Sequence, residues 1–107
     1  MSMYTELEDN NLMKDFLEPN DDKYILVMYG RGNCGNCKKL KPRFEARGDG
    51  SLGDDILFIY SDVDKYRENI FVDDLDVIPH FALFKGMKFI GESIGSDKNY
   101  MELLNLI

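Results

Sequence analysis

Two cysteines stand three positions apart in the stretch R-G-N-C-G-N-C-K, and the chain contains no others. The stretch follows K-Y-I-L-V-M-Y, an apolar run typical of a buried strand, and precedes residues with helical spacing. We therefore expect Cys34 at the amino terminus of a helix, where unpaired backbone N–H groups and the helix dipole stabilise a thiolate. The pKa of the Cys34 thiol should then lie below the free value of about 8.5. Arg31 and Lys38, which flank the pair, should lower this pKa further.

This arrangement has the groups that thiol–disulfide exchange requires. Cys34 would attack a disulfide, and Cys37, one helical turn deeper, would resolve the mixed disulfide. A metal site is a weaker alternative, because a structural zinc site needs four ligands and the chain offers two cysteines and one histidine. Such a site would need a second chain or a small thiol. A third possibility, that both cysteines merely fill the core and take part in no reaction, fits less well, because the pair lies in a loop-to-helix turn and not on an apolar stripe. We expect no metal and no cofactor.

The elements that position the pair follow from turn signals and hydrophobic spacing. The patterns predict strands near residues 3–7, 23–29 and 55–62, helical spacing ending at residue 17, and a helix over about 35–47 that contains Pro42. A short helix or irregular segment is expected at residues 64–75. Gly86-Met87 predicts a type II′ hairpin between two further strands, and Ser96 or Asp97 can cap a last helix. This order predicts a central mixed sheet between helices. Four aromatic residues on the strands are expected in the core: Phe58, Phe81, Phe84 and Phe89.

Length and charge limit the possible functions. The 107 residues predict a single domain, 1–107, and the net charge of −7 disfavours nonspecific nucleic-acid binding. Residues 31–47 nevertheless hold six basic residues against one acid, either as a solvated helix face or as a surface that attracts anions or thiolate-bearing partners. No apolar run approaches the roughly 18 residues of a membrane span. The acidic, polar start is unlike a signal peptide, so we expect a cytoplasmic protein with no membrane partner.

Two stretches resemble the thioredoxin family. I-L-V-M-Y-G-R-G-N-C-G-N-C-K-K-L-K-P is similar to its active-site region, and D-V-I-P-H-F-A-L-F-K-G-M-K-F-I-G-E-S-I-G is similar to its cis-proline loop and hairpin. The resemblance runs from about residue 24 to 107 and implies an α/β, thioredoxin-like fold, a central mixed β-sheet flanked by helices on both faces. It also implies that Pro79 is cis and packs against the dithiol. The Ile78 backbone would pair with an incoming peptide, and Gly95 would end the hairpin near the site.

The sequence departs from the family around the cysteines. Asn33 and Gly30 stand where the family has tryptophans, and Gly35-Asn36 is not a dipeptide of its common classes. Asn33, Gly35 and Asn36 are expected to border the substrate. Because the dipeptide tunes the reduction potential, the sequence leaves open whether the protein is a reductant, an oxidant or an isomerase.

A second departure lies beneath the site. Met28 replaces the family's buried aspartate, and Tyr60 replaces the lysine that pairs with it. Losing both partners avoids an unpaired buried charge, which would cost about 3–5 kcal/mol. We predict an intact core but a slower resolving step, since Cys37 lacks its usual base. His80 has two interpretations: an idle, partly exposed residue, or an imidazolium near Cys34 that lowers the thiol pKa.

The resemblance implies a thiol–disulfide oxidoreductase that acts on protein disulfides. A reductase or glutathione would supply electrons, and we expect a monomer. Two alternatives are a glutaredoxin-like, glutathione-dependent oxidoreductase and a redox-inactive binding module with the same fold. The substrate and the electron donor do not follow from the sequence.

Overall fold

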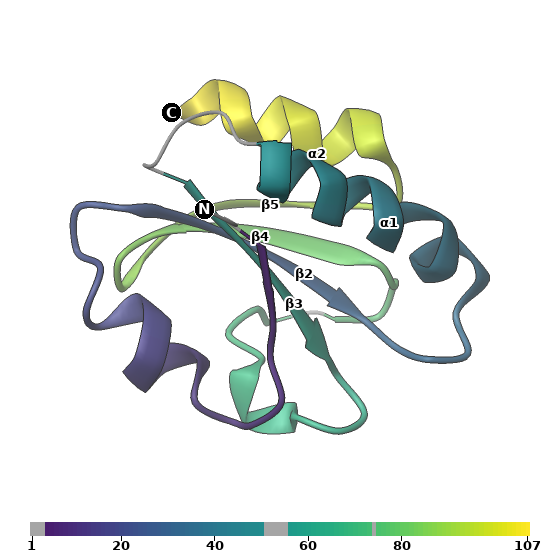
Figure 1. The fold of residues 1–107 in the computed structure, drawn as a ribbon, viewed down its shortest axis with the longest axis horizontal. Helices are drawn as coiled ribbons and strands as arrows, with labels where there is room; N and C mark the ends of the chain where they lie inside the picture. Colours follow the sequence, from purple (N-terminus) through teal and green to yellow (C-terminus); the bar gives the residue numbers. More distant parts are fainter. Residues whose placement is uncertain (1–3, 51–55, 74) are drawn as a thin grey trace.

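The computed structural model describes residues 4–50, 56–73 and 75–107, and a five-stranded mixed sheet lies at its centre (Figure 1). The strand order is β1-β3-β2-β4-β5, with β1 and β2 parallel to β3, and with β4 antiparallel to both β2 and β5. The strands are β1 (Tyr4–Glu6), β2 (Tyr24–Gly30), β3 (Ile56–Asp62), β4 (His80–Lys85) and β5 (Lys88–Ile94). The predicted mixed sheet is therefore confirmed, and β2, which leads to the cysteines, is its middle strand.

Helical segments cover both faces of the sheet, as predicted (Figure 1). One face carries α1 (Gly35–Gly50), α2 (Asp97–Leu103) and the 3-10 helix η3 (Leu104–Leu106). The opposite face carries the π-helix η1 (Met13–Leu17) and the 3-10 helix η2 (Arg67–Asn69). Ser96 caps α2, because its hydroxyl accepts a hydrogen bond from the Asn99 N–H at 3.3 Å. Pro42 lies within α1. In the part of the chain described, no helix is both long enough and apolar enough to cross a membrane.

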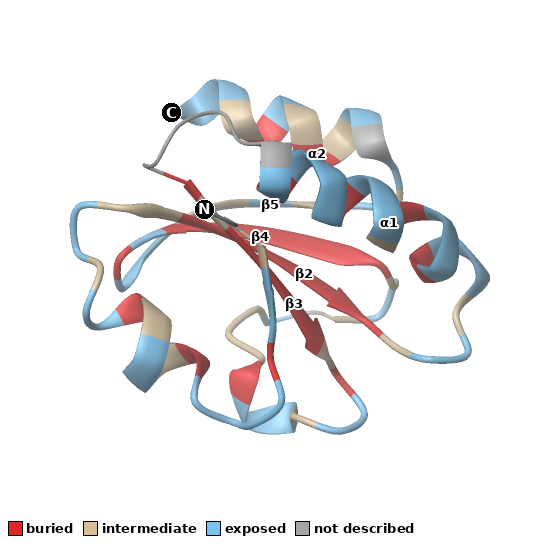
Figure 2. Ribbon diagram, viewed as in Figure 1, coloured by how far each residue is buried: buried red, intermediate tan, exposed pale blue. Residues whose placement is uncertain are grey.

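The buried residues form two hydrophobic clusters, one on each face of the sheet. Figure 2 shows that buried residues fill most of the central strands. We call these clusters the α1-side cluster, which includes Phe44 of α1, and the η1-side cluster, which includes Leu17 of η1. Side chains along β2 alternate between the two: Leu26 and Met28 belong to the α1-side cluster, whereas Ile25 and Val27 belong to the η1-side cluster. This explains the continuous apolar run in the sequence, since a strand covered on both faces has no polar side.

Phe44 is the centre of the α1-side cluster. Its ring centroid lies 5.1 Å from that of Phe58, 5.7 Å from that of Tyr100 and 5.8 Å from that of Phe81. Aromatic pairs at these separations contribute beyond simple burial. The cluster therefore fixes α1, and with it the cysteine pair, against the sheet.

The prediction that all four strand phenylalanines are buried was wrong for Phe89, which is 46% exposed. Phe89 lies on β5, an edge strand, and contacts Phe84 edge-on with ring centroids 5.8 Å apart. It shares the face of Phe84, which belongs to the η1-side cluster, whereas α2 packs on β5 from the other face. The edge position leaves one side of the ring in solvent.

Candidate active site

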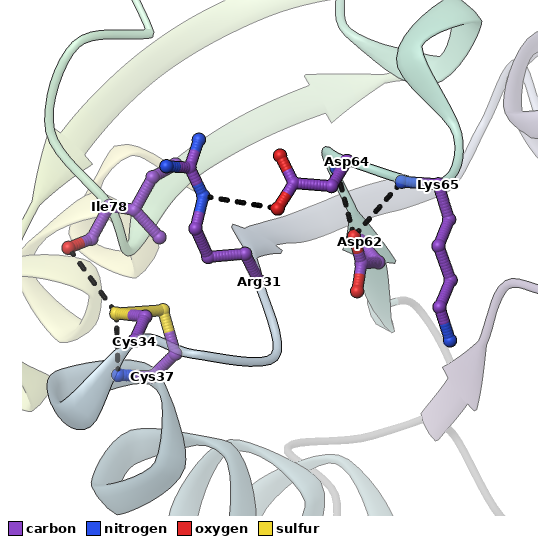
Figure 3. Close-up of polar contacts among 7 residues, drawn as sticks. All are labelled: Arg31, Cys34, Cys37, Asp62, Asp64, Lys65 and Ile78. Atoms are coloured by element: carbon purple, nitrogen blue, oxygen red, sulfur yellow. Dashed lines mark hydrogen bonds and ion pairs between the residues drawn. A yellow bond between two sulfur atoms is a disulfide. The ribbon is translucent and has the colours of Figure 1, made fainter.

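The two cysteines lie where β2 ends and α1 begins, and they are joined by a disulfide with 5.2 Å between their Cα atoms (Figure 3). Their exposures differ. Cys34 is half-buried in the loop before α1, whereas Cys37 is only 2% exposed and belongs to the α1-side cluster. A substrate can therefore reach the first sulfur much more easily than the second.

The backbone around Cys34 suits a sulfur anion. The N–H of Cys37 donates a hydrogen bond to Cys34 Sγ at 3.1 Å, and the first turn of α1 holds no acidic residue. An N–H at a helix amino terminus, together with the helix dipole, stabilises a thiolate when the disulfide is reduced. The local structure thus places a hydrogen-bond donor and a helix amino terminus at this sulfur, and the lowered thiol pKa stays a prediction.

The loop before β4 reaches the same sulfur. The Ile78 carbonyl oxygen lies 3.8 Å from Cys34 Sγ, and the Ile78–Pro79 peptide bond is cis, as the resemblance implied (Figure 3). The Gly95 N–H donates a hydrogen bond to the Pro79 carbonyl oxygen at 3.1 Å. Gly95 has a φ of +94°, a conformation that favours glycine. Ile78, Pro79 and Gly95 are therefore brought together beside Cys34.

The residues between and before the cysteines are open to solvent. Asn33, Gly35 and Asn36 are all exposed. Asn36 and Gly95 also line a pocket of about 600 Å³ between α1 and the start of α2. Three cationic side chains line it as well: Lys39, Arg43 and Lys98. Part of the basic segment noted in the sequence thus forms a surface next to the disulfide.

Arg31 and Lys38 lie in different settings. The Nε of Arg31 is 3.6 Å from a carboxylate oxygen of Asp64, so this charge is partly neutralised (Figure 3). Lys38 is exposed and lines a small pocket that also reaches Cys37. Their influence on the pKa of Cys34 stays a prediction.

His80 is buried, not partly exposed as one interpretation assumed. Its Nε2 lies 2.8 Å from a carboxylate oxygen of Glu92 on β5. Side chains alternate along β4, where Phe81 enters the α1-side cluster and Ala82 the opposite one. His80 therefore faces the side of the sheet away from α1. The structure places the imidazole against Glu92 and gives no support for the second interpretation, a contact with Cys34.

Met28 and Tyr60, the two substituted positions, are direct neighbours in the register of β2 and β3. Met28 is fully buried, and both residues share the α1-side cluster with Cys37. Tyr60 reaches the cysteine pair because Gly30 has no side chain. A Cβ on Gly30 would lie 2.9 Å from the Tyr60 hydroxyl oxygen and 3.2 Å from Cys37 Sγ. The approach of Tyr60 to Cys37 was not predicted from the sequence, although the glycine at position 30 was a signal for it.

Within the described residues, no group of three or more histidine, cysteine, aspartate or glutamate side chains could hold a metal ion. The site contains the Cys34–Cys37 disulfide and a backbone N–H that donates a hydrogen bond to Cys34 Sγ. The carbonyl oxygen of Ile78, in the adjoining loop, faces the same sulfur. This arrangement can form and break a disulfide.

Comparison with known proteins agrees with this chemistry. A family model described as Thioredoxin matches residues 4–107. Thioredoxin from Oryctolagus cuniculus is 28% identical over 100 residues, which cover 94% of this chain and 93% of that protein. Thioredoxin from Gallus gallus is 31% identical over 86 residues, which cover 80% of each chain. The crystal structure of Schistosoma mansoni thioredoxin matches with a TM-score of 0.81 and 25% identity, over 97% of this chain and 95% of that one.

These similarities favour neither the glutathione-dependent alternative nor the redox-inactive binding module. The family model covers nearly the whole chain, and the disulfide of Cys34 and Cys37 lies at the strand-to-helix junction. The chain belongs to the thioredoxin family and is a thiol–disulfide oxidoreductase.

Proposed function

We propose that Cys34 is the attacking thiol and Cys37 the resolving thiol in exchange with protein disulfides. The observation that carries this assignment is the asymmetry of the pair. Cys34 is accessible and accepts a hydrogen bond from the Cys37 N–H at 3.1 Å, whereas Cys37 is 2% exposed. A nucleophile must meet its substrate, and a resolving group must meet only the sulfur beside it.

The exchange conserves electrons and protons. The Cys34 thiolate attacks one sulfur of the substrate disulfide, forms a mixed disulfide, and releases the other sulfur as a thiolate that takes up a proton. Cys37 loses its proton and attacks Cys34 Sγ. This step releases the second substrate thiol and leaves the Cys34–Cys37 disulfide that the structure shows. Two electrons from a reductase or from glutathione then restore the dithiol.

The substrate chain would lie across the loop beside Cys34. The Ile78 backbone would pair with it, and Asn33, Gly35, Asn36, Pro79 and Gly95 would surround its disulfide. Val77 is 48% exposed next to Ile78 and offers an apolar contact. The pocket lined by Lys39, Arg43 and Lys98 adjoins Asn36, so acidic residues near the substrate disulfide would strengthen binding. We further propose a cytoplasmic monomer that acts on proteins and not on nucleic acids or membranes, in keeping with the net charge of −7.

The assignment is tested by trapping. The Cys37→Ser variant should accumulate a mixed disulfide with a protein substrate, because attack proceeds and resolution does not. The Cys34→Ser variant should accumulate none, since its remaining sulfur is buried. Trapping by Cys34→Ser and not by Cys37→Ser would reverse the roles.

Two further measurements give the direction of the reaction and the electron donor. Turnover of a protein disulfide with thioredoxin reductase or with glutathione as electron source identifies the donor. A reduction potential near about −270 mV would indicate a reductant, and one near about −180 or −120 mV an isomerase or an oxidant.

A further inference from the structure

The burial of Cys37 creates a chemical problem for the resolving step. The thiolate is the species that attacks a disulfide, and taking a thiol out of water disfavours its ionisation. Cys37 is 2% exposed, and Met28, beneath it in the same cluster, carries no charge. A neighbouring group that stabilises the anion would lower this cost.

The Tyr60 hydroxyl lies in the right place. It and Cys37 Sγ face the same small space, since the point where a Cβ on Gly30 would stand is 2.9 Å from the oxygen and 3.2 Å from the sulfur. Any side chain at position 30 would fill this space. Gly30 thus keeps open the approach between the phenol and the thiol.

Charges of both signs surround this space. Tyr60 and Cys37 both line a pocket of about 140 Å³, and the described residues around it include the cations Arg31, Lys38 and Lys41. The Lys41 ammonium lies 4.3 Å from the centroid of the Tyr60 ring. Two of these cations are paired with acids, Lys41 Nζ with Glu6 at 2.8 Å and Arg31 Nε with Asp64 at 3.6 Å, so their attraction for an anion in this space is reduced. A space of this size can hold a water molecule.

The phenol keeps its proton under ordinary conditions. Burial, with smaller contributions from the negative charges of Asp62 and Glu6, raises the pKa of Tyr60 to about 12. Near neutral pH the group is therefore a hydrogen-bond donor and not a base. A neutral O–H that donates to a sulfur anion stabilises the anion without adding a charge of its own.

We propose that Tyr60 is a catalytic residue of the resolving step, whose O–H donates to the Cys37 sulfur, directly or through one water, as the thiolate forms. The Cys37 proton leaves through the pocket toward solvent, and the phenol retains its own. This inference rests on the proposed role of Cys37.

Substitution of the hydroxyl alone tests the inference. In a Cys34→Ser background, the pKa of Cys37 is followed by the chemical shift of its ¹³C-labelled Cβ. Tyr60→Phe should raise this pKa by about one unit, which corresponds to roughly a tenfold lower thiolate fraction near neutral pH. With both cysteines present, decay of the mixed disulfide at pH 7 should slow by about tenfold, and its pH profile should shift upward by the same unit.

Tyr24→Phe is the matched control. Tyr24 also lies under a lysine, with Lys85 Nζ 5.3 Å from its ring centroid, but at the opposite end of β2 from the cysteines. Loss of the Tyr24 hydroxyl should leave both the pKa of Cys37 and the decay rate of the mixed disulfide unchanged. The rate at which Cys34 attacks substrate should be the same in all three proteins, which separates a local effect from general damage.

A Cys37 pKa and a decay rate that stay within twofold in Tyr60→Phe would overturn the inference. Equal shifts in Tyr24→Phe would do the same, since they would show a general effect. Neither result would affect the roles of Cys34 and Cys37, because trapping by Cys37→Ser tests those roles separately.

Discussion

The substitution Met28→Asp measures how much a charge in the core beside the site lowers the free energy of unfolding. Met28 is fully buried in the α1-side cluster, and Tyr60 is its neighbour on β3. A carboxyl group introduced here is desolvated, so its pKa in the folded state should rise by about three units above the unfolded value of about 3.9. At about 1.36 kcal/mol per unit, the penalty at neutral pH is about 4 kcal/mol. That is a large share of the 5–15 kcal/mol typical of a domain.

The pH dependence of this penalty has a definite sign. Because the pKa is raised on folding, the folded state holds a proton that the unfolded state releases above about pH 4. The electrostatic penalty is therefore absent below about pH 4, grows between about pH 4 and 7, and is constant above that window. Urea unfolding at pH 4 and pH 7 should show a gap between wild type and Met28→Asp that widens by about 3 kcal/mol.

A double-mutant cycle with Tyr60→Lys then measures the coupling of the two positions. An ion pair at about 4 Å, with an effective dielectric constant near 20, is worth about 4 kcal/mol. Met28→Asp/Tyr60→Lys should accordingly be more stable than the sum of the two single changes by about 2–4 kcal/mol. Single effects that add to within about 0.5 kcal/mol, or a gap that does not change with pH, would refute this account of positions 28 and 60. In the single variant Met28→Asp, the mixed disulfide should decay faster than in wild type. An unchanged or slower decay would count against a missing base at position 28.

Two further substitutions test the packing around the site. Tyr29 donates a hydrogen bond to the Asn69 carbonyl oxygen at 2.7 Å, so Tyr29→Phe should cost about 1–3 kcal/mol in urea unfolding. Burial raises the pKa of Tyr29, so the free energy of unfolding of the wild type should fall as the pH rises above about 10. The free energy of unfolding of Tyr29→Phe should fall less steeply over the same range, and equal slopes for the two proteins would contradict this. Gly95→Ala should cost about 1–2 kcal/mol, because φ is +94°, and should weaken substrate binding. Gly32→Ala, whose Cβ would meet nothing within 4 Å, should be neutral to within about 0.5 kcal/mol, and an equal loss in both would refute the conformational argument.

The fold and the reactive pair could be predicted from the sequence because their signals are local. A continuous apolar run followed by glycines and C-x-x-C places the cysteines between a strand and a helix, and the structure has β2 end at Gly30 and α1 begin at Gly35. The two-residue hairpin loop at Gly86-Met87 and the Ser96 cap were likewise correct, since each depends on one or two residues.

The misplaced residues depend on contacts between distant segments. His80 is buried and paired with Glu92, which lies twelve positions away and comes near only through the register of β4 and β5. Phe89 is exposed because β5 is an edge strand, a property of strand order and not of its own sequence. The approach of Tyr60 to Cys37 depends on an absent side chain at Gly30, on a different strand. Side-chain pattern alone carries none of this information.

Ile78 contacts both hydrophobic clusters and also the reactive disulfide. Its side chain packs against the clusters on both faces of the sheet, while its carbonyl oxygen lies 3.8 Å from Cys34 Sγ. A change of volume in the η1-side cluster should therefore shift the backbone beside the reactive sulfur, because a close-packed interior transmits strain. We therefore expect Leu17→Ala, a change within that enclosed cluster, to alter the reduction potential of the cysteine pair without altering any residue at the surface of the site.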